Sequence, residues 1–557
     1  MRDRDINVWK KERWNGIIRY SFWIIVFILL FIRCFISFNG QDEAFYITSA
    51  NRLMQGDRLF IDEWYMTQFY SVLLVPFLFI YKSIFMSYTG VMLFFRLLYL
   101  AFSFSICGYF SHVLIKKHNK SIIETYICMA LILFYKRDNI EGMSYYNVCL
   151  LLIVLTIAFM MDKKWVLSGI SIFGGILCNP YLFMLLSVLS VVFLIKHEGM
   201  KIGKVWFGLI GTGVIFIGGV MLRQDLSETI NSISDIMMMV KMHSVSSPVE
   251  RLKSWIYIIV MDYRYLTIPS ICFIFYRTCL LLYKKGNHIA NMVKKYCFIY
   301  CLGLLLFYSV RYGMVCGNAQ VLLSILGLVA LFSIEPWDRK MEVSAFLLIA
   351  GGIVSLCWHF ASDTWDAFRI GFVISSLGAV FALCMFLENM NEWSEKSRID
   401  WRTVTKAAIC IVALCSFVSR FFYLYREENI WEQNTRITEG PAKGLYTTYE
   451  KERNYAEVLQ ASTEINELIE LREDHTVYID SSDIWEYLIY DAHCGGYTTW
   501  TTSINNPALK LYWEKHGYPD CVILANGSVS PITESMPDSP LYSKMLVENR
   551  IVYYKEQ

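Results

Sequence analysis

The chain is poor in charge for its length. Only 18% of its 557 residues are Asp, Glu, Lys or Arg, whereas soluble globular proteins carry about a quarter. With 55% hydrophobic residues and a mean hydropathy of +0.40, this composition excludes an ordinary soluble enzyme. The net charge is only +2 and no basic stripe is present, so nucleic acid is not expected as a partner. The sequence predicts a polytopic α-helical membrane protein.

Several covalent or processing signals are also missing. The sixteen cysteines form no disulfide framework, because most lie inside long apolar runs as small buried residues. The polar C-terminal region contains only Cys494 and Cys521, for which a disulfide and two free thiols are both open. No internal repeat is evident. The first apolar run lacks a small-residue cleavage site, so it is expected to stay as an anchor.

Thirteen apolar runs are long enough to predict membrane spans. They cover 17–38, 90–114, 121–135, 145–161, 166–178, 179–195, 203–222, 264–283, 294–312, 317–334, 342–360, 367–388 and 405–424. The equally apolar run 69–86 is assigned to a helix at the membrane surface, because counting it as a span would move Lys116, Lys117 and Lys120 outside. Positive charge stays in the cytoplasm, which predicts a plasma-membrane protein with a cytoplasmic N-terminus.

This topology predicts two domains. Residues 1–424 are expected to form the transmembrane domain, with long outer loops at 39–89 and 223–263. Residues 425–557 are expected to form an extracytoplasmic α/β domain. Within it, Thr476–Asp480 and Cys521–Ala525 have the composition of short buried strands, 454–471 is typical of a helix, and 551–554 of a further strand.

The most informative segment follows the first span. Apolar residues at 46, 50 and 53 have helical spacing and Gly56 suits a C-cap, so Asp42 and Glu43 should begin a short helix near the membrane surface. One interpretation is structural, with Asp42 capping the helix and Glu43 complementing its dipole. The other is chemical, because carboxylates in such a place can act as a general base or bind a divalent cation.

The acid pair and the residues after it resemble a known superfamily. An Asp-Glu pair in a long first outer loop, then Gly90 and Arg96 at the second span and a glycine-rich hairpin at 167–177, is similar to the GT-C membrane glycosyltransferases. The nearest likeness is to the protein O-mannosyltransferases and the aminoarabinose transferase of lipid A. The matching motifs cover 39–195, and the rest agrees in architecture. The His-Pro-Pro-type motif of that family is absent; residues 66–71 stand in its place.

The resemblance implies a cell-envelope glycosyltransferase that takes a sugar from a polyprenyl-phosphate-linked donor at the outer membrane face. Asp42 would be the general base for an acceptor hydroxyl, and Glu43 would assist it or help hold a cation. The acceptor stays open among a glycan, a lipid and a protein. No glycine-rich phosphate loop follows a strand, which favours a lipid-linked donor over a cytoplasmic nucleotide-linked one.

Further polar residues on the outer side are candidates for the same site. Asp138 or Glu141 of the second outer loop could complete a carboxylate cluster, and Asp42, Glu43 and Asp138 together would suit Mg²⁺ or Mn²⁺. The alternative is that these acids only keep a short loop in water.

Candidate binders of the donor phosphate are basic residues near the outer face. They are Arg311, Arg369, Lys241 and Arg251, with His243 as a possible catalytic side chain.

Two other functions remain open. A transporter or flippase of lipid-linked saccharides is disfavoured because the charges gather at the outer helix ends instead of near mid-membrane. A non-catalytic membrane scaffold that kept the fold would explain the missing motif after the acid pair.

Overall fold

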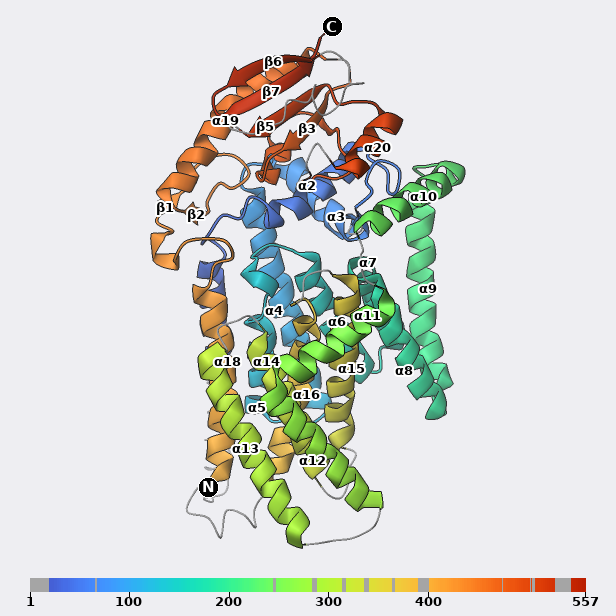
Figure 1. Ribbon diagram of the computed structural model, residues 1–557, viewed down its shortest axis with the longest axis vertical. Coiled ribbons are helices and arrows are strands. Elements are labelled where there is room, and N and C mark those ends of the chain that lie inside the picture. Colours follow the sequence, from blue (N-terminus) through green and yellow to red (C-terminus); the bar gives the residue numbers. More distant parts are fainter. Residues whose placement is uncertain are drawn as a thin grey trace, which may run out of the picture.

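The structure is a computed structural model, and it is mostly helical, with a small sheet region at the C-terminus. It describes residues 20–65, 68–243, 247–282, 288–312, 317–334, 340–362, 366–388, 400–472, 474–500, 502, 506–525 and 542–556. The long helices run side by side as a bundle, and the sheet region lies at one end of it (Figure 1).

Every predicted span coincides with a helix. These helices are Tyr20–Arg33, α4 (Val91–Lys117), α5 (Ile122–Leu133), α6 (Tyr145–Met161), α7 (Trp165–Cys178), η2 (Pro180–Leu182) with α8 (Phe183–Ile195), α9 (Gly199–Met221), α12 (Arg264–Leu282), α13 (His288–Tyr312), α14 (Asn318–Ser333), α15 (Lys340–Ala361), α16 (Arg369–Glu388) and α18 (Trp401–Phe422). The apolar periodicity of the sequence therefore located the helices to within a few residues.

The count of thirteen spans is not confirmed. Among the described residues, six helices are long and apolar enough to cross a membrane, or seven if a bent pair counts as one span. Seven further apolar helices are shorter than 18 residues. The six include α3 (Gln68–Phe85), for which the surface assignment stays a prediction. Helices of this length and composition make the chain a membrane protein.

The region 223–263 was expected to be a loop and is instead helical. It forms α10 (Leu226–His243), α11 (Pro248–Tyr257) and a π-helical turn, η3 (Ile258–Asp262). A capping box starts α11, because Ser247 and Glu250 each bind the other's backbone N–H. The chain bends by 99° between this segment and α12.

The C-terminal domain is built on a five-stranded mixed sheet with the order β4-β3-β5-β7-β6. Its strands are β3 (Thr476–Asp480), β4 (His493–Cys494), β5 (Cys521–Ala525), β6 (Tyr542–Val547) and β7 (Arg550–Lys555). The predictions of strands at 476–480, 521–525 and 551–554 are confirmed. The predicted helix is α19 (Tyr449–Glu470), which begins earlier than expected because Thr448 caps it. Two short strands, β1 (Thr435–Arg436) and β2 (Tyr446–Thr447), pair outside the main sheet.

The strand pairing shows that Cys494 and Cys521 do not form a disulfide. Val477 of β3 pairs with Cys494 on one side and with Cys521 on the other. The two cysteines are therefore two strand spacings apart, about 9.5 Å, which is beyond the ~7 Å Cα separation that a disulfide spans. Both are buried free thiols.

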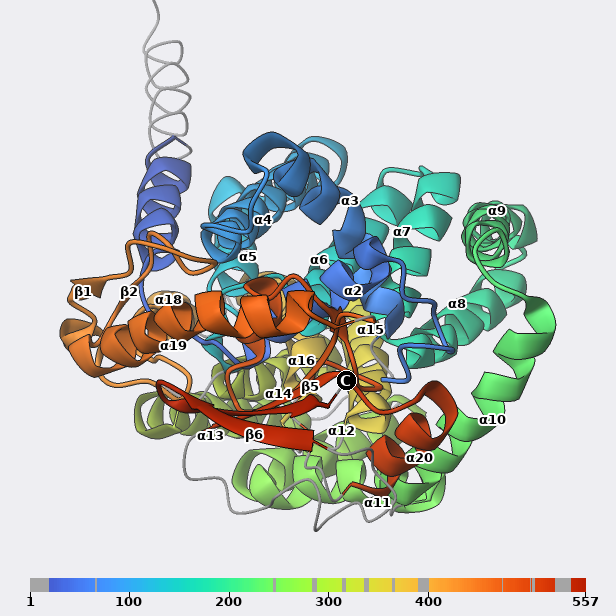
Figure 2. The ribbon, with the colours of Figure 1, turned by 90° about the horizontal axis from the view of Figure 1, so that it is seen from above.

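The helix α2 (Asp42–Gln55) lies between the bundle and the C-terminal domain (Figure 1). Seen from above, that domain lies across the end of the bundle, with α9 at the periphery (Figure 2). Backbone hydrogen bonds join the two parts, from Tyr446 to the Phe35 carbonyl (2.7 Å) and from Trp485 to the Gly40 carbonyl (3.2 Å). The acid pair is thus at a junction of two domains.

Candidate functional site

The start of α2 is shaped by the turn before it. The side-chain oxygen of Asn39 accepts hydrogen bonds from the backbone N–H groups of Gln41 (3.1 Å) and Asp42 (2.8 Å). Gln41 is the N-cap residue and its side chain makes no capping bond. Gly56 adopts the left-handed conformation (φ 118°) and its N–H bonds the Arg52 carbonyl, so the predicted C-cap is confirmed.

Asp42 is the first residue of the helix, and it does not cap it. Its side chain is 14% exposed, and its Oδ2 atom is buried and accepts no hydrogen bond from the described residues. The Nη1 atom of Arg426 lies 3.6 Å from that oxygen. Burial raises the pKa of the Asp42 carboxyl, against the charges of Arg426 and Arg137 and a hydrogen bond from Asn39. The capping interpretation of Asp42 is therefore wrong.

Glu43 lies in a different environment from its neighbour. It is 1% exposed and forms a bidentate ion pair with the guanidinium of Arg96, at 2.7 Å and 2.6 Å. Arg96 also donates to the carbonyls of Cys34 (2.9 Å) and Ile36 (3.1 Å). With both oxygens engaged, Glu43 ties α2 to α4 and to the end of the first helix.

Asp138 belongs to the same surroundings as Asp42. It lies in the turn η1 (Arg137–Asn139) with φ 52°, a left-handed conformation that Asp tolerates better than most residues. Burial raises the pKa of its carboxyl to about 6, and the negative charges of Asp366 and Asp42 add to the rise, while Arg137 opposes it. Asp42, Asp138 and Asp366 thus face one polar region.

Arg137 contacts two of these carboxylates and a neighbouring aromatic ring. Its Nη2 atom donates to Asp366 at 3.1 Å, its Nε atom lies 3.4 Å from Asp138, and its guanidinium covers the ring of Tyr146 at 3.8 Å. Arg137, Asp366 and Arg426 were not among the predicted site residues. The available signals were weak: a charged residue in a short outer loop for the first two, and a basic residue after the last span for Arg426.

Glu141 does not join the Asp42 region. It is buried in a cluster with Arg420 (Nη2 to Oε2, 2.6 Å), Lys136 (2.9 Å) and Arg33 (3.4 Å). Burial, with the charge of Arg420, lowers the pKa of Lys136 well below its usual range, which reduces the excess of positive charge. Of the two acids that could complete a carboxylate cluster, Asp138 lies near Asp42, whereas Glu141 pairs with these basic residues.

The predicted phosphate binders are scattered. Arg311 is exposed at the end of α13, whereas Arg369 is buried at the start of α16 against Gly317. Arg251 donates to the Phe360 carbonyl at 2.7 Å. Lys241 and His243 fall on α10, and their side chains lie outside the described residues. The cations whose charges act on Asp42 are instead Arg426 and Arg137.

The predicted metal ligands do not fit a common ion. Both Glu43 oxygens bind Arg96, and Asp138 is engaged by Arg137 and by a hydrogen bond with Asp366. In the part of the chain that the structure describes, no group of three or more His, Cys, Asp or Glu side chains could hold a metal ion.

An apolar groove of about 620 Å³ lies beside the acid region. It is lined by hydrophobic residues of α3, α4, α6, α7 and α9, and Met143 lies at the loop end of it. The hydroxyl of Tyr70 donates to the Met143 carbonyl, and its ring packs edge-on against Tyr46 at 5.8 Å. Tyr46 is one helical turn after Asp42, so aromatic side chains connect the groove to the carboxylate.

No protein-family model matches the chain, and no curated protein matches it significantly.

Proposed function

We propose that the protein is a membrane glycosyltransferase that moves a sugar from a polyprenyl-phosphate-linked donor to an acceptor hydroxyl at the outer face of the membrane, with Asp42 as general base. The observation that carries this proposal is the state of the Asp42 carboxyl. It is mostly buried, its pKa is raised, and one oxygen has no hydrogen-bond donor among the described residues. A carboxylate with these properties is ready to accept a proton.

The reaction requires a balanced displacement. Asp42 takes the proton of the acceptor hydroxyl, the acceptor oxygen forms a bond to the anomeric carbon, and the bond from that carbon to the phosphate oxygen breaks. The leaving phosphate keeps the electron pair, and guanidinium groups stabilise such charge well. Arg137 and Arg426, whose charges act on Asp42, are suited to that role.

Glu43 has a positioning role in this proposal. Because Arg96 binds both of its oxygens, it fixes the first turn of α2 and hence the direction of Asp42. The apolar groove supports a lipid-linked donor, since its 620 Å³ volume is lined almost entirely by hydrophobic side chains. A prenyl chain in the groove would keep its phosphate end near the membrane surface and α2.

The test is replacement of Asp42 by Asn in cells that lack the endogenous gene. Loss of the base should lower transfer about 10²–10⁴-fold, because general base catalysis contributes that much. Surface glycans and lipid-linked intermediates are analysed by mass spectrometry, and protein amount by immunoblot. Asp491→Asn, an exposed carboxyl of the C-terminal domain, is the matched control and should restore transfer fully.

Full restoration by Asp42→Asn would show that the assigned base is wrong. A deletion strain that traps lipid-linked sugar on the inner leaflet would support a flippase in place of a transferase.

A further inference from the structure

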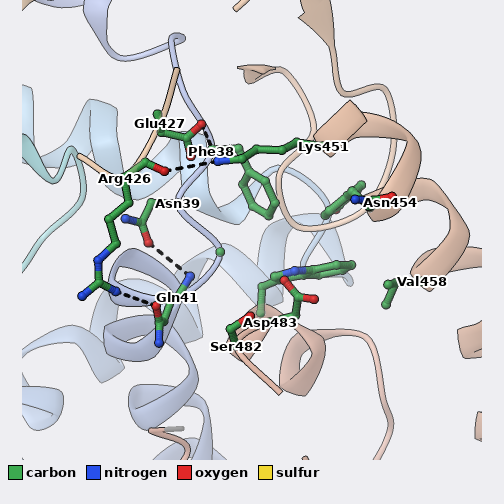
Figure 3. Close-up of a pocket in the computed structure, with 13 residues that line it drawn as sticks. Phe38, Asn39, Gln41, Arg426, Glu427, Lys451, Asn454, Val458, Ser482 and Asp483 are labelled. Atoms are coloured by element: carbon green, nitrogen blue, oxygen red, sulfur yellow. Dashed lines mark hydrogen bonds and ion pairs between the residues drawn. The ribbon is translucent and has the colours of Figure 1, made fainter. Parts of the chain in front are cut away.

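A second cavity lies between the loop before α2 and the C-terminal domain. It has a volume of about 410 Å³ and is lined by residues 38–41, 426 and 427, by α19, and by the start of η5 (Ile484–Leu488) (Figure 3). This volume is in the range of about 300–1,000 Å³ that is usual for small-ligand pockets. Gln41 in its wall directly precedes Asp42.

Both cations in the cavity wall face a carboxylate. Lys451 lies 2.7 Å from Glu427 and Arg426 lies 3.6 Å from Asp42, while Asp483 shares Arg550 with the buried Glu486. The wall therefore offers no unopposed positive charge to an anionic ligand, and a neutral ligand suits it.

The rest of the wall combines aromatic rings with amides. Tyr455 and Trp485 stack at 4.2 Å, and Phe38 meets Tyr455 edge-on at 5.2 Å. The exposed amide of Asn454 has no partner among the described residues. An apolar wall beside a free amide matches a sugar, whose C–H face is apolar and whose hydroxyls both donate and accept.

We propose that this cavity binds the acceptor, and that the acceptor is a neutral saccharide. This inference rests on the proposed function and adds the class of acceptor. Arg426 connects the two places, because its Nη1 atom lies 2.8 Å from Gln41 Oε1 in the cavity wall and 3.6 Å from Asp42 Oδ2. A sugar in the cavity would thus lie next to the base that activates its hydroxyl.

The experiment measures binding separately from transfer. Purified full-length protein in lipid nanodiscs is applied to immobilised short neutral oligosaccharides of gluco, galacto and manno configuration, with a serine- and threonine-containing peptide beside them. Asn454→Trp and Ser482→Trp fill the cavity from two exposed positions, and Arg453→Trp, an exposed neighbour on α19 outside the cavity, is the matched control.

At least one saccharide should bind the wild-type protein. Both filling variants should weaken that binding about tenfold or more, and Arg453→Trp should leave it within about twofold. Failure of every saccharide to bind, binding that survives both filling variants, or displacement of the saccharide by the peptide would overturn the proposal.

Asp42→Asn separates this inference from the proposed function. The variant should bind the saccharide and fail to transfer. If Asp42→Asn binds the saccharide and transfers normally, Asp42 is not the base, and the cavity can still be the acceptor site. If transfer requires Asp42 but the protein binds no saccharide, the role of the cavity as acceptor site is refuted and the role of Asp42 is not.

Discussion

Asp42 and Glu43 are neighbours in the chain but lie in different chemical environments. Glu43 forms a bidentate ion pair with Arg96, which fixes its position. Asp42 keeps one oxygen that accepts no hydrogen bond from the described residues, and the guanidinium of Arg426 lies 3.6 Å from it. Burial raises the pKa of the Asp42 carboxyl against the charges of Arg426 and Arg137 and a hydrogen bond from Asn39.

The coupling of Asp42 to Asp138 predicts a change in pH dependence. The negative charge of Asp42 is one of the causes that raise the pKa of the Asp138 carboxyl to about 6. Asp42→Asn removes that charge, so the pKa of Asp138 should fall. The measurement is the pH dependence of the carboxyl infrared bands of the purified protein.

Asp138→Asn identifies the infrared band of Asp138, and it should keep the fold because Asn tolerates the left-handed backbone at this position as Asp does. Asp491→Asn is the matched control and should leave the pKa of Asp138 unchanged. A rise of that pKa in Asp42→Asn, or no change, would contradict the electrostatic coupling of the two carboxyls.

At the scale of elements, two glycines let helices α7 and α9 touch. A Cβ atom on Gly169 would lie 2.0 Å from the Val205 carbonyl oxygen, and one on Gly208 would lie 2.2 Å from that of Val166. Small residues at such crossings permit close backbone packing in membranes. Because both helices line the apolar groove, their spacing also sets its width.

Gly208→Ala should therefore destabilise the protein by about 1–3 kcal/mol, the usual cost of overpacking. The midpoint of thermal unfolding in detergent, followed by tryptophan fluorescence, should fall. Gly211→Ala in the same helix is the matched control, since a Cβ there meets no atom within 4 Å. Equal midpoints for the two variants would argue against a close α7–α9 contact.

At the scale of the whole molecule, the C-terminal domain contributes to the acid region. Arg426, just after α18, reaches Asp42, and the hydroxyl of Thr499 lies 2.9 Å from that of Thr48 on α2. Asp42 is thus enclosed only when the bundle and this domain are in contact.

The charge pattern predicts which side of the membrane carries this domain. Arg453→Cys on α19 should react in intact cells with a maleimide that does not cross membranes. Lys164→Cys, exposed at the opposite predicted side before α7, should react only after permeabilisation. Labelling is measured above that of the wild-type chain, because native cysteines are present, and the reverse pattern would overturn the predicted orientation.

Local pattern was enough to predict the helices, the start and C-cap of α2 and three strands of the C-terminal sheet. Hydrophobic patterns and turn residues involve only a few neighbouring positions, so helices, caps and strands can be predicted from the sequence alone. The number of membrane spans was harder to predict. Seven of the apolar helices are short, and their composition does not show whether they cross the membrane.

The roles of the acids depend on partners far away in sequence. Glu43 meets Arg96 across 53 positions and Glu141 meets Arg420 across 279. Neither pairing can be read from local spacing, and each occupies both oxygens of a carboxylate that looked equivalent to Asp42 or Asp138. Only the tertiary structure distinguishes these ion-paired carboxylates from Asp42, because burial and charge pairing arise only when distant segments pack together.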